Sequence, residues 1–102
     1  MTFMNIFELP ELPLAEELTT VLAESGRVRI ERIVSAGQIS GWYDQAETEF
    51  VALLEGEAAI VFEDGRDVAL SRGDAITIAP HERHRVAYTS ADPPCVWLCV
   101  FY

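Results

Sequence analysis

From residue 28 onward the sequence consists of short apolar stretches separated by turns that contain glycine or proline. This pattern constrains the fold more than any other feature of the chain. The stretches lie at 28–34, 50–54, 58–62, 68–70, 75–78, 85–89 and 96–101. The first alternates apolar and polar residues with a period of two, which is typical of a half-buried strand. Asp64-Gly65 between two of the stretches is a strong hairpin signal. Six to eight short strands at this spacing predict an all-β sandwich or barrel.

The first 26 residues show a different pattern. Residues 1–13 read as an arm with apolar side chains and two prolines. Pro13 suits the first turn of a helix, and Gly26 suits a left-handed helix end. Four apolar side chains between them share one helical face: Leu14, Leu18, Val21 and Leu22. The sequence therefore predicts one short helix within 14–25, so that 1–26 forms an arm and a helix and 27–102 forms the barrel.

Charge excludes several functions. The 102 residues carry 17 acidic and 7 basic side chains, for a formal charge of −10, and all the basic residues are arginines. A length of this order favours one domain. An acidic chain lacks the basic footprint that nucleic acids and anionic membranes require. The absence of lysine excludes Schiff-base chemistry and a Walker-type phosphate lysine.

The cysteines and the N-terminus bear on the compartment. Cys95 and Cys99, the only cysteines, fall on one predicted strand about 13 Å apart, too far for a disulfide. Residues 1–10 lack the basic start of a signal peptide, and the longest apolar run, at 95–102, is far shorter than a membrane span. We therefore expect two core thiols and a cytoplasmic protein.

Few residues are suited to carry chemistry. His81 and His84 are the only histidines and lie three apart after Pro80. They read either as two ligands of one metal ion or as loop histidines bonded to carboxylates. Glu49 precedes a fully apolar strand, where a carboxylate is costly unless it is paired or metal-bound. The alternative for Glu49 is a solvated strand-edge residue.

Other charged and aromatic residues have simpler interpretations. Arg29 and Glu31 read as a solvated pair on a strand. The last strand places four side chains on one face, which we expect to be core or barrel wall: Cys95, Trp97, Cys99 and Phe101.

Two spaced motifs resemble those of the cupin family. Glu49, followed after six residues by Gly56, is similar to the second half of the first cupin motif. The stretch from Gly73-Asp74 to His84 is similar to the second motif, a Gly-Asp turn, a strand, a proline turn and a histidine. The resemblance covers residues 28–102 and implies a small antiparallel jelly-roll barrel with its site inside.

The resemblance also implies a site. The family's paired histidines of the first motif fall here on Tyr43 and Gln45, or on Trp42 and Asp44 in the other register. His84 matches the metal histidine of the second motif. The implied ligands of a divalent ion (Zn, Fe, Mn or Ni) are His84 and Glu49, with His81 and Gln45 as replacement donors. Tyr43 and Trp42 are expected at the pocket mouth, where they would contact a substrate.

Two classes of function follow as expectations. The first is a metal-dependent enzyme of the dioxygenase or isomerase type, with a small-molecule substrate inside the barrel. The second is a non-catalytic small-molecule binding or regulatory protein, either metal-free or with a structural metal. The lost histidine pair favours the second. The apolar arm also predicts a homodimer.

Overall fold

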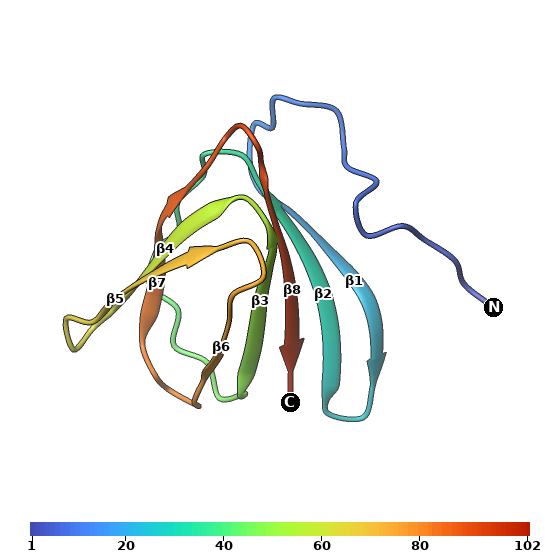
Figure 1. Ribbon diagram of the computed structural model, residues 1–102. Coiled ribbons are helices and arrows are strands. Elements are labelled where there is room, and N and C mark those ends of the chain that lie inside the picture. Colours follow the sequence, from blue (N-terminus) through green and yellow to red (C-terminus); the bar gives the residue numbers. More distant parts are fainter.

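Eight antiparallel strands form two facing sheets in the computed structural model, which describes residues 1–102 (Figure 1). The larger sheet has the order β1-β2-β8-β3-β6, and the smaller has the order β5-β4-β7. The strands are β1 (Leu18–Ser25), β2 (Val28–Ser35), β3 (Glu49–Glu55), β4 (Glu57–Phe62), β5 (Asp67–Ser71), β6 (Ala75–Ile78), β7 (His84–Thr89) and β8 (Cys95–Phe101). This is the predicted all-β jelly roll of the cupin type. The structure contains no helix that could span a membrane.

The helix predicted within 14–25 is wrong. The segment forms β1, which pairs with β2 from Leu18 opposite Val34 to Ser25 opposite Val28. Gly26 has φ +57° and begins the two-residue turn between these strands instead of ending a helix. The β-branched residues within 19–21 favour an extended chain. The apolar spacing that suggested a helix therefore belongs to an edge strand of the larger sheet.

The inner face of the larger sheet is built from cross-strand rows. Along β2, β8 and β3 the register aligns Ile33 with Trp97 and Leu53, and aligns Glu31 with Cys99 and Val51. A third row contains Arg29, Phe101 and Glu49. The apolar members of these rows pack with the inner residues of β4 and β5 into one core cluster. Phe101 of the third row belongs to this cluster as well, so apolar core residues and the polar members of the rows share the inner face.

Gly56 is the single residue between β3 and β4, where the chain passes from the larger sheet to the smaller. Its φ is +92°, a conformation that favours glycine. A Cβ atom built at this position would lie 2.8 Å from Cys95 Sγ and 2.9 Å from Pro94 O. The glycine of the first motif is therefore explained by both backbone conformation and close packing.

The N-terminal arm is fastened to the outside of the larger sheet. Arg32 on β2 is buried, and its Nη1 donates hydrogen bonds to the carbonyls of Ile6 (3.2 Å) and Glu8 (2.8 Å). Gln38 Nε2 donates another to Leu14 O at 3.0 Å. Figure 1 shows the arm running alongside β1, away from the smaller sheet. Phe3 and Phe7 of the arm remain exposed.

Candidate binding cavity

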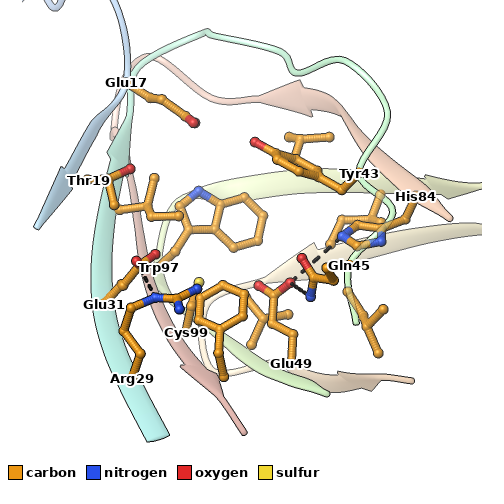
Figure 2. A pocket seen from close by; sticks show the side chains of 16 residues that line it. Glu17, Thr19, Arg29, Glu31, Tyr43, Gln45, Glu49, His84, Trp97 and Cys99 are labelled. Atoms are coloured by element: carbon orange, nitrogen blue, oxygen red, sulfur yellow. Dashed lines mark hydrogen bonds and ion pairs between the residues drawn. The ribbon is translucent and has the colours of Figure 1, made fainter. Parts of the chain in front are cut away.

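A cavity of about 270 Å³ opens between the two sheets. The larger sheet contributes the polar ends of its rows, and the smaller sheet contributes His84 with Ile60 and Val86. Figure 2 shows the lining side chains. They are Glu17, Thr19, Arg29, Glu31, Ile33, Tyr43, Gln45, Glu49, Val51, Ile60, Ile78, His84, Val86, Trp97, Cys99 and Phe101. An apolar base with a few convergent polar groups is the usual composition of a small-molecule site.

His84 is the most deeply placed polar group of the smaller sheet. Its side chain is 4% exposed, and β7 holds it opposite Phe62 of β4. Its Nδ1 lies 2.8 Å from the carbonyl oxygen of Glu82. A carbonyl only accepts, so Nδ1 carries the proton and Nε2 is the free nitrogen. Nε2 faces Glu49 across the cavity and has no hydrogen-bond partner in the protein.

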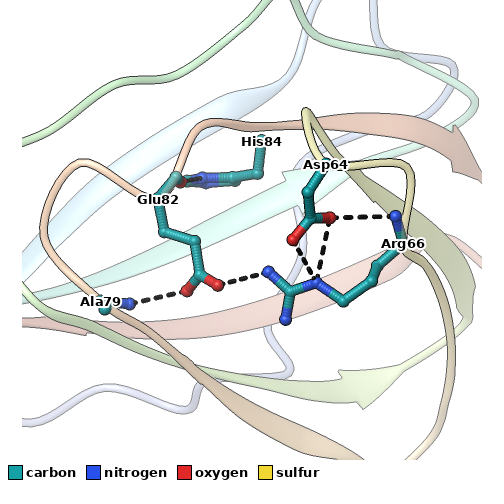
Figure 3. Close-up of polar contacts among 5 residues, drawn as sticks. All are labelled: Asp64, Arg66, Ala79, Glu82 and His84. Atoms are coloured by element: carbon teal, nitrogen blue, oxygen red, sulfur yellow. Dashed lines mark hydrogen bonds and ion pairs between the residues drawn. The ribbon is translucent and has the colours of Figure 1, made fainter.

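A polar network on the outer side fixes this orientation of His84. Glu82 Oε1 accepts a hydrogen bond from Ala79 N at 3.0 Å, and Oε2 accepts one from Arg66 Nη2 at 2.5 Å (Figure 3). Arg66 is held in turn by Asp64, whose Oδ2 lies 2.8 Å from Nε. These bonds hold the loop residue whose carbonyl orients the imidazole. The hydrogen bonds from Arg66 and Ala79 lower the pKa of Glu82.

Glu49 faces His84 from the opposite sheet. Its side chain is 10% exposed, and its Oε1 lies 3.8 Å from His84 Nε2, beyond hydrogen-bond distance. Gln45 Nε2 donates a hydrogen bond to the same oxygen at 3.0 Å. Tyr43 forms a backbone bridge to His84, and its ring centroid lies 5.5 Å from the imidazole. The structure thus brings together four of the predicted site residues: Tyr43, Gln45, Glu49 and His84.

Two predicted residues lie elsewhere. His81 is 68% exposed at its side chain and its Nδ1 pairs with Asp44 Oδ1 at 2.8 Å, away from the cavity lining. Its φ of +60° places it in the left-handed region, which few residues other than glycine adopt. This matches the alternative interpretation of His81 as a loop histidine bonded to a carboxylate. Trp42 also lies outside the cavity, with the guanidinium groups of Arg83 and Arg85 over its ring at 5.3 and 5.4 Å.

The cavity contains charged residues that the sequence did not identify. Arg29 and Glu31, expected to be a solvated pair, both line it, with Arg29 Nε 2.8 Å from Glu31 Oε2. Glu17 stands at the rim, and burial raises its pKa. The alternation of β2 placed 29, 31 and 33 on one face and was the available signal. Glu17 was not identified because the segment that contains it was predicted to be helical.

The aromatic and thiol groups of β8 lie as predicted. Trp97, Cys99 and Phe101 share the inner face, and both cysteines are free and buried. Burial, followed by the nearby carboxylate of Glu49, raises the pKa of the Cys99 thiol. Cys99 is therefore a protonated wall residue at neutral pH.

The metal prediction can be compared with these donors. His84 and Glu49 face each other, whereas no three His, Cys, Asp or Glu side chains converge closely enough to hold a metal ion. Catalytic zinc sites usually have three protein ligands. Gln45 directs its amide nitrogen, not its oxygen, at Glu49. The donor set as it stands does not fit a resident divalent ion.

Comparison with known proteins defines the class. Residues 28–101 match the cupin domain family, and the chain belongs to that family. No protein with a curated description matches the sequence.

Solved structures agree with this assignment. A putative mannose-6-phosphate isomerase from Ralstonia eutropha JMP134 is 34% identical, with 99% of this chain and 97% of that chain covered and a TM-score of 0.93. A cupin superfamily protein from Desulfitobacterium hafniense DCB-2 is 22% identical, with 90% and 82% covered and a TM-score of 0.78. An RmlC-like cupin from Desulfovibrio desulfuricans is 18% identical, with 99% and 94% covered and a TM-score of 0.76. The last two support the fold alone.

Proposed function

We propose that this cupin binds a small molecule in the cavity between its sheets, without a resident metal, through Glu49 and His84. The observation that carries the proposal is the free Nε2 of His84, on a side chain 4% exposed that faces the cavity. Nε2 is open to the cavity and unpaired in the protein, so a ligand that donates a hydrogen bond to it fills an acceptor that the chain leaves free. The facing carboxylate of Glu49 supplies a second acceptor.

Thermal unfolding against a ligand panel tests the proposal. Sugars, polyols, amines, carboxylic acids and sugar phosphates are screened on the wild type and on Glu49→Gln. Glu16→Gln is the control, because it removes the same charge from an exposed position outside the cavity. Stabilisation by one ligand class that is lost in Glu49→Gln and retained in Glu16→Gln supports cavity binding. Identical screens for all three proteins would refute it.

A metal-dependent isomerase is the second candidate function. The Ralstonia eutropha protein's name favours an isomerase. The Nδ1 bond of His84 favours a metal, because metal-bound histidines usually donate their other nitrogen to a carbonyl or carboxylate. A divalent ion there would use His84, Glu49 and a reversed Gln45 amide. Stoichiometric metal in protein from metal-replete cells, lost in His84→Ala, together with mannose 6-phosphate turnover, would establish this candidate. Metal-free protein that still binds a ligand would exclude it.

A homodimer and a cytoplasmic location remain part of the proposal. The exposed apolar residues of the arm, among them Phe3 and Phe7, and of the edge strand β1, among them Val21, support self-association. The free, buried thiols of Cys95 and Cys99 suit a reducing compartment. Sedimentation equilibrium at micromolar concentration tests the dimer, and a monomer would contradict it.

A further inference from the structure

The cavity lining is negatively charged. Glu17, Glu31 and Glu49 face it, and Arg29 is the only arginine among the lining residues. That guanidinium is already engaged, with Nε 2.8 Å from Glu31 and Nη1 3.1 Å from Glu47. The Cζ atom of Arg29 also lies 4.4 Å from the centre of the Phe101 ring. Arg29 therefore neutralises its neighbours and is not free to bind an anionic ligand.

The three carboxylates act on one region. Each contributes to raising the pKa of Cys99 in the cavity wall, after the larger effect of burial. The carboxylates of Glu17 and Glu49 also raise the pKa of Tyr43, again after burial. In Figure 2 the indole of Trp97 lies between Glu17 and Glu49. A group bound over this indole is thus exposed to negative charge from two sides.

Hydrogen-bond polarity gives an independent argument. With its proton on Nδ1, the imidazole of His84 presents Nε2 as an acceptor, and the side chain is 4% exposed. The carboxylates of Glu17 and Glu49 are acceptors as well. The amide of Gln45 is occupied by Glu49. A ligand that pairs with these acceptors must carry hydrogen-bond donors.

We infer that the ligand is a small organic cation, an amine or guanidine with an apolar body, and not a phosphorylated sugar. The ammonium group would lie beside Glu49 and Nε2 of His84, with its body against Trp97 and Tyr43, and Glu17 would add negative charge from the far side of the indole. Aromatic faces attract such cations in addition to the carboxylates. A phosphate would face the carboxylates of Glu17 and Glu49 without a free arginine, and the chain has no lysine. This inference rests on the proposed cavity binding and specifies its ligand class.

Isothermal titration with four probes tests the ligand class. Benzylamine, benzyl alcohol and benzyl phosphate share one ring and differ in the headgroup, and mannose 6-phosphate represents the relative's named substrate. Measurements use an amine-free buffer of low ionic strength, so that charge effects are not screened. We expect benzylamine to bind more tightly than the other three.

Variants locate the site of binding. Glu49→Gln lowers benzylamine affinity by about tenfold, since its carboxylate is buried and charge-assisted bonds are strong. Glu17→Gln lowers it by about threefold because the rim is solvated. Glu16→Gln leaves it unchanged. Fluorescence of Trp42→Phe, which keeps Trp97 as the only tryptophan, confirms that the probe reaches the cavity.

The outcomes separate this inference from the function on which it rests. Equal or tighter binding of benzyl alcohol, benzyl phosphate or mannose 6-phosphate, still sensitive to Glu49→Gln, overturns the cation and keeps the cavity as a binding site. No binding of any probe, or binding insensitive to both cavity variants, overturns the cation inference. The broader ligand screen then decides whether cavity binding fails as well.

Discussion

Replacing Gly56 with alanine should destabilise the barrel through two separable effects. The first is backbone strain, because φ +92° costs a non-glycine residue about 1–3 kcal/mol. The second is steric: the new Cβ would lie 2.9 Å from Cys95 Cα and 2.9 Å from Pro94 O. Backbone atoms cannot move aside as a flexible side chain can, and such overpacking costs about 1–3 kcal/mol more. The total expected loss is about 2–6 kcal/mol.

Gly73→Ala is the matched control. Gly73 has the same φ of +92°, but a Cβ there has nothing within 4 Å. It should therefore lose only the strain contribution, about 1–3 kcal/mol. Urea unfolding gives both free energies, and the melting temperature should fall by about 4–8 °C for each kcal/mol. Equal losses for the two variants would refute the steric argument at Gly56.

Three further predictions concern the arm and two carboxylates. Arg32→Ala removes the hydrogen bonds to Ile6 and Glu8, so a protease that does not cleave at arginine should cut the arm faster in this variant than in Arg27→Ala. Equal cleavage rates would contradict the role of Arg32 in holding the arm. Hydrogen bonds from Arg66 and Ala79 lower the pKa of Glu82. The ionised Glu82 therefore stabilises the folded state fully above pH 4.5, the ordinary pKa, and this stabilisation is lost as pH falls through the lowered pKa. Glu82→Gln should thus lose about 0.5–1 kcal/mol in urea unfolding at pH 7, and progressively less as pH falls below 4.5; a constant loss would count against this. Burial raises the pKa of Glu17, so folding favours its protonated form. Glu17→Gln should therefore be more stable than the wild type at pH 7, but not below pH 4.5. A variant less stable than the wild type at pH 7 would contradict this prediction.

Strand positions were largely predictable because short-range chemistry determines them. Asp64-Gly65 and Arg72-Gly73-Asp74 mark turns, and the segments between them are too apolar to be loops. The helix within 14–25 failed for a reason that local spacing cannot reveal. Leu18, Val21 and Leu22 satisfy a helical spacing, but pairing with β2 stabilises the extended form.

The candidate site was predictable only where motif and register agreed. Glu49 and His84 were found because each begins a strand at a motif position and both face the barrel interior. His81 lies three residues before the motif position of His84, in the turn, where its backbone is left-handed and its side chain pairs with Asp44. Glu31 was missed although the alternation of β2 puts it on one face with Ile33, because nothing local shows that this face lines a cavity. Glu17 was missed because its place at the cavity depends on the segment that follows it pairing with β2 as a strand.

The ¹⁵N spectrum of the two imidazole rings tests directly whether His84 offers an acceptor nitrogen to a ligand in the cavity. At pH 8, where an ordinary imidazole is neutral, a long-range ¹H–¹⁵N correlation reports which nitrogen of each ring carries the proton. We expect His84 to be protonated at Nδ1, and benzylamine to move its Nε2 resonance while the resonances of exposed His81 stay unchanged. A proton on Nε2 of His84, or a ligand that moves only His81, would contradict this expectation.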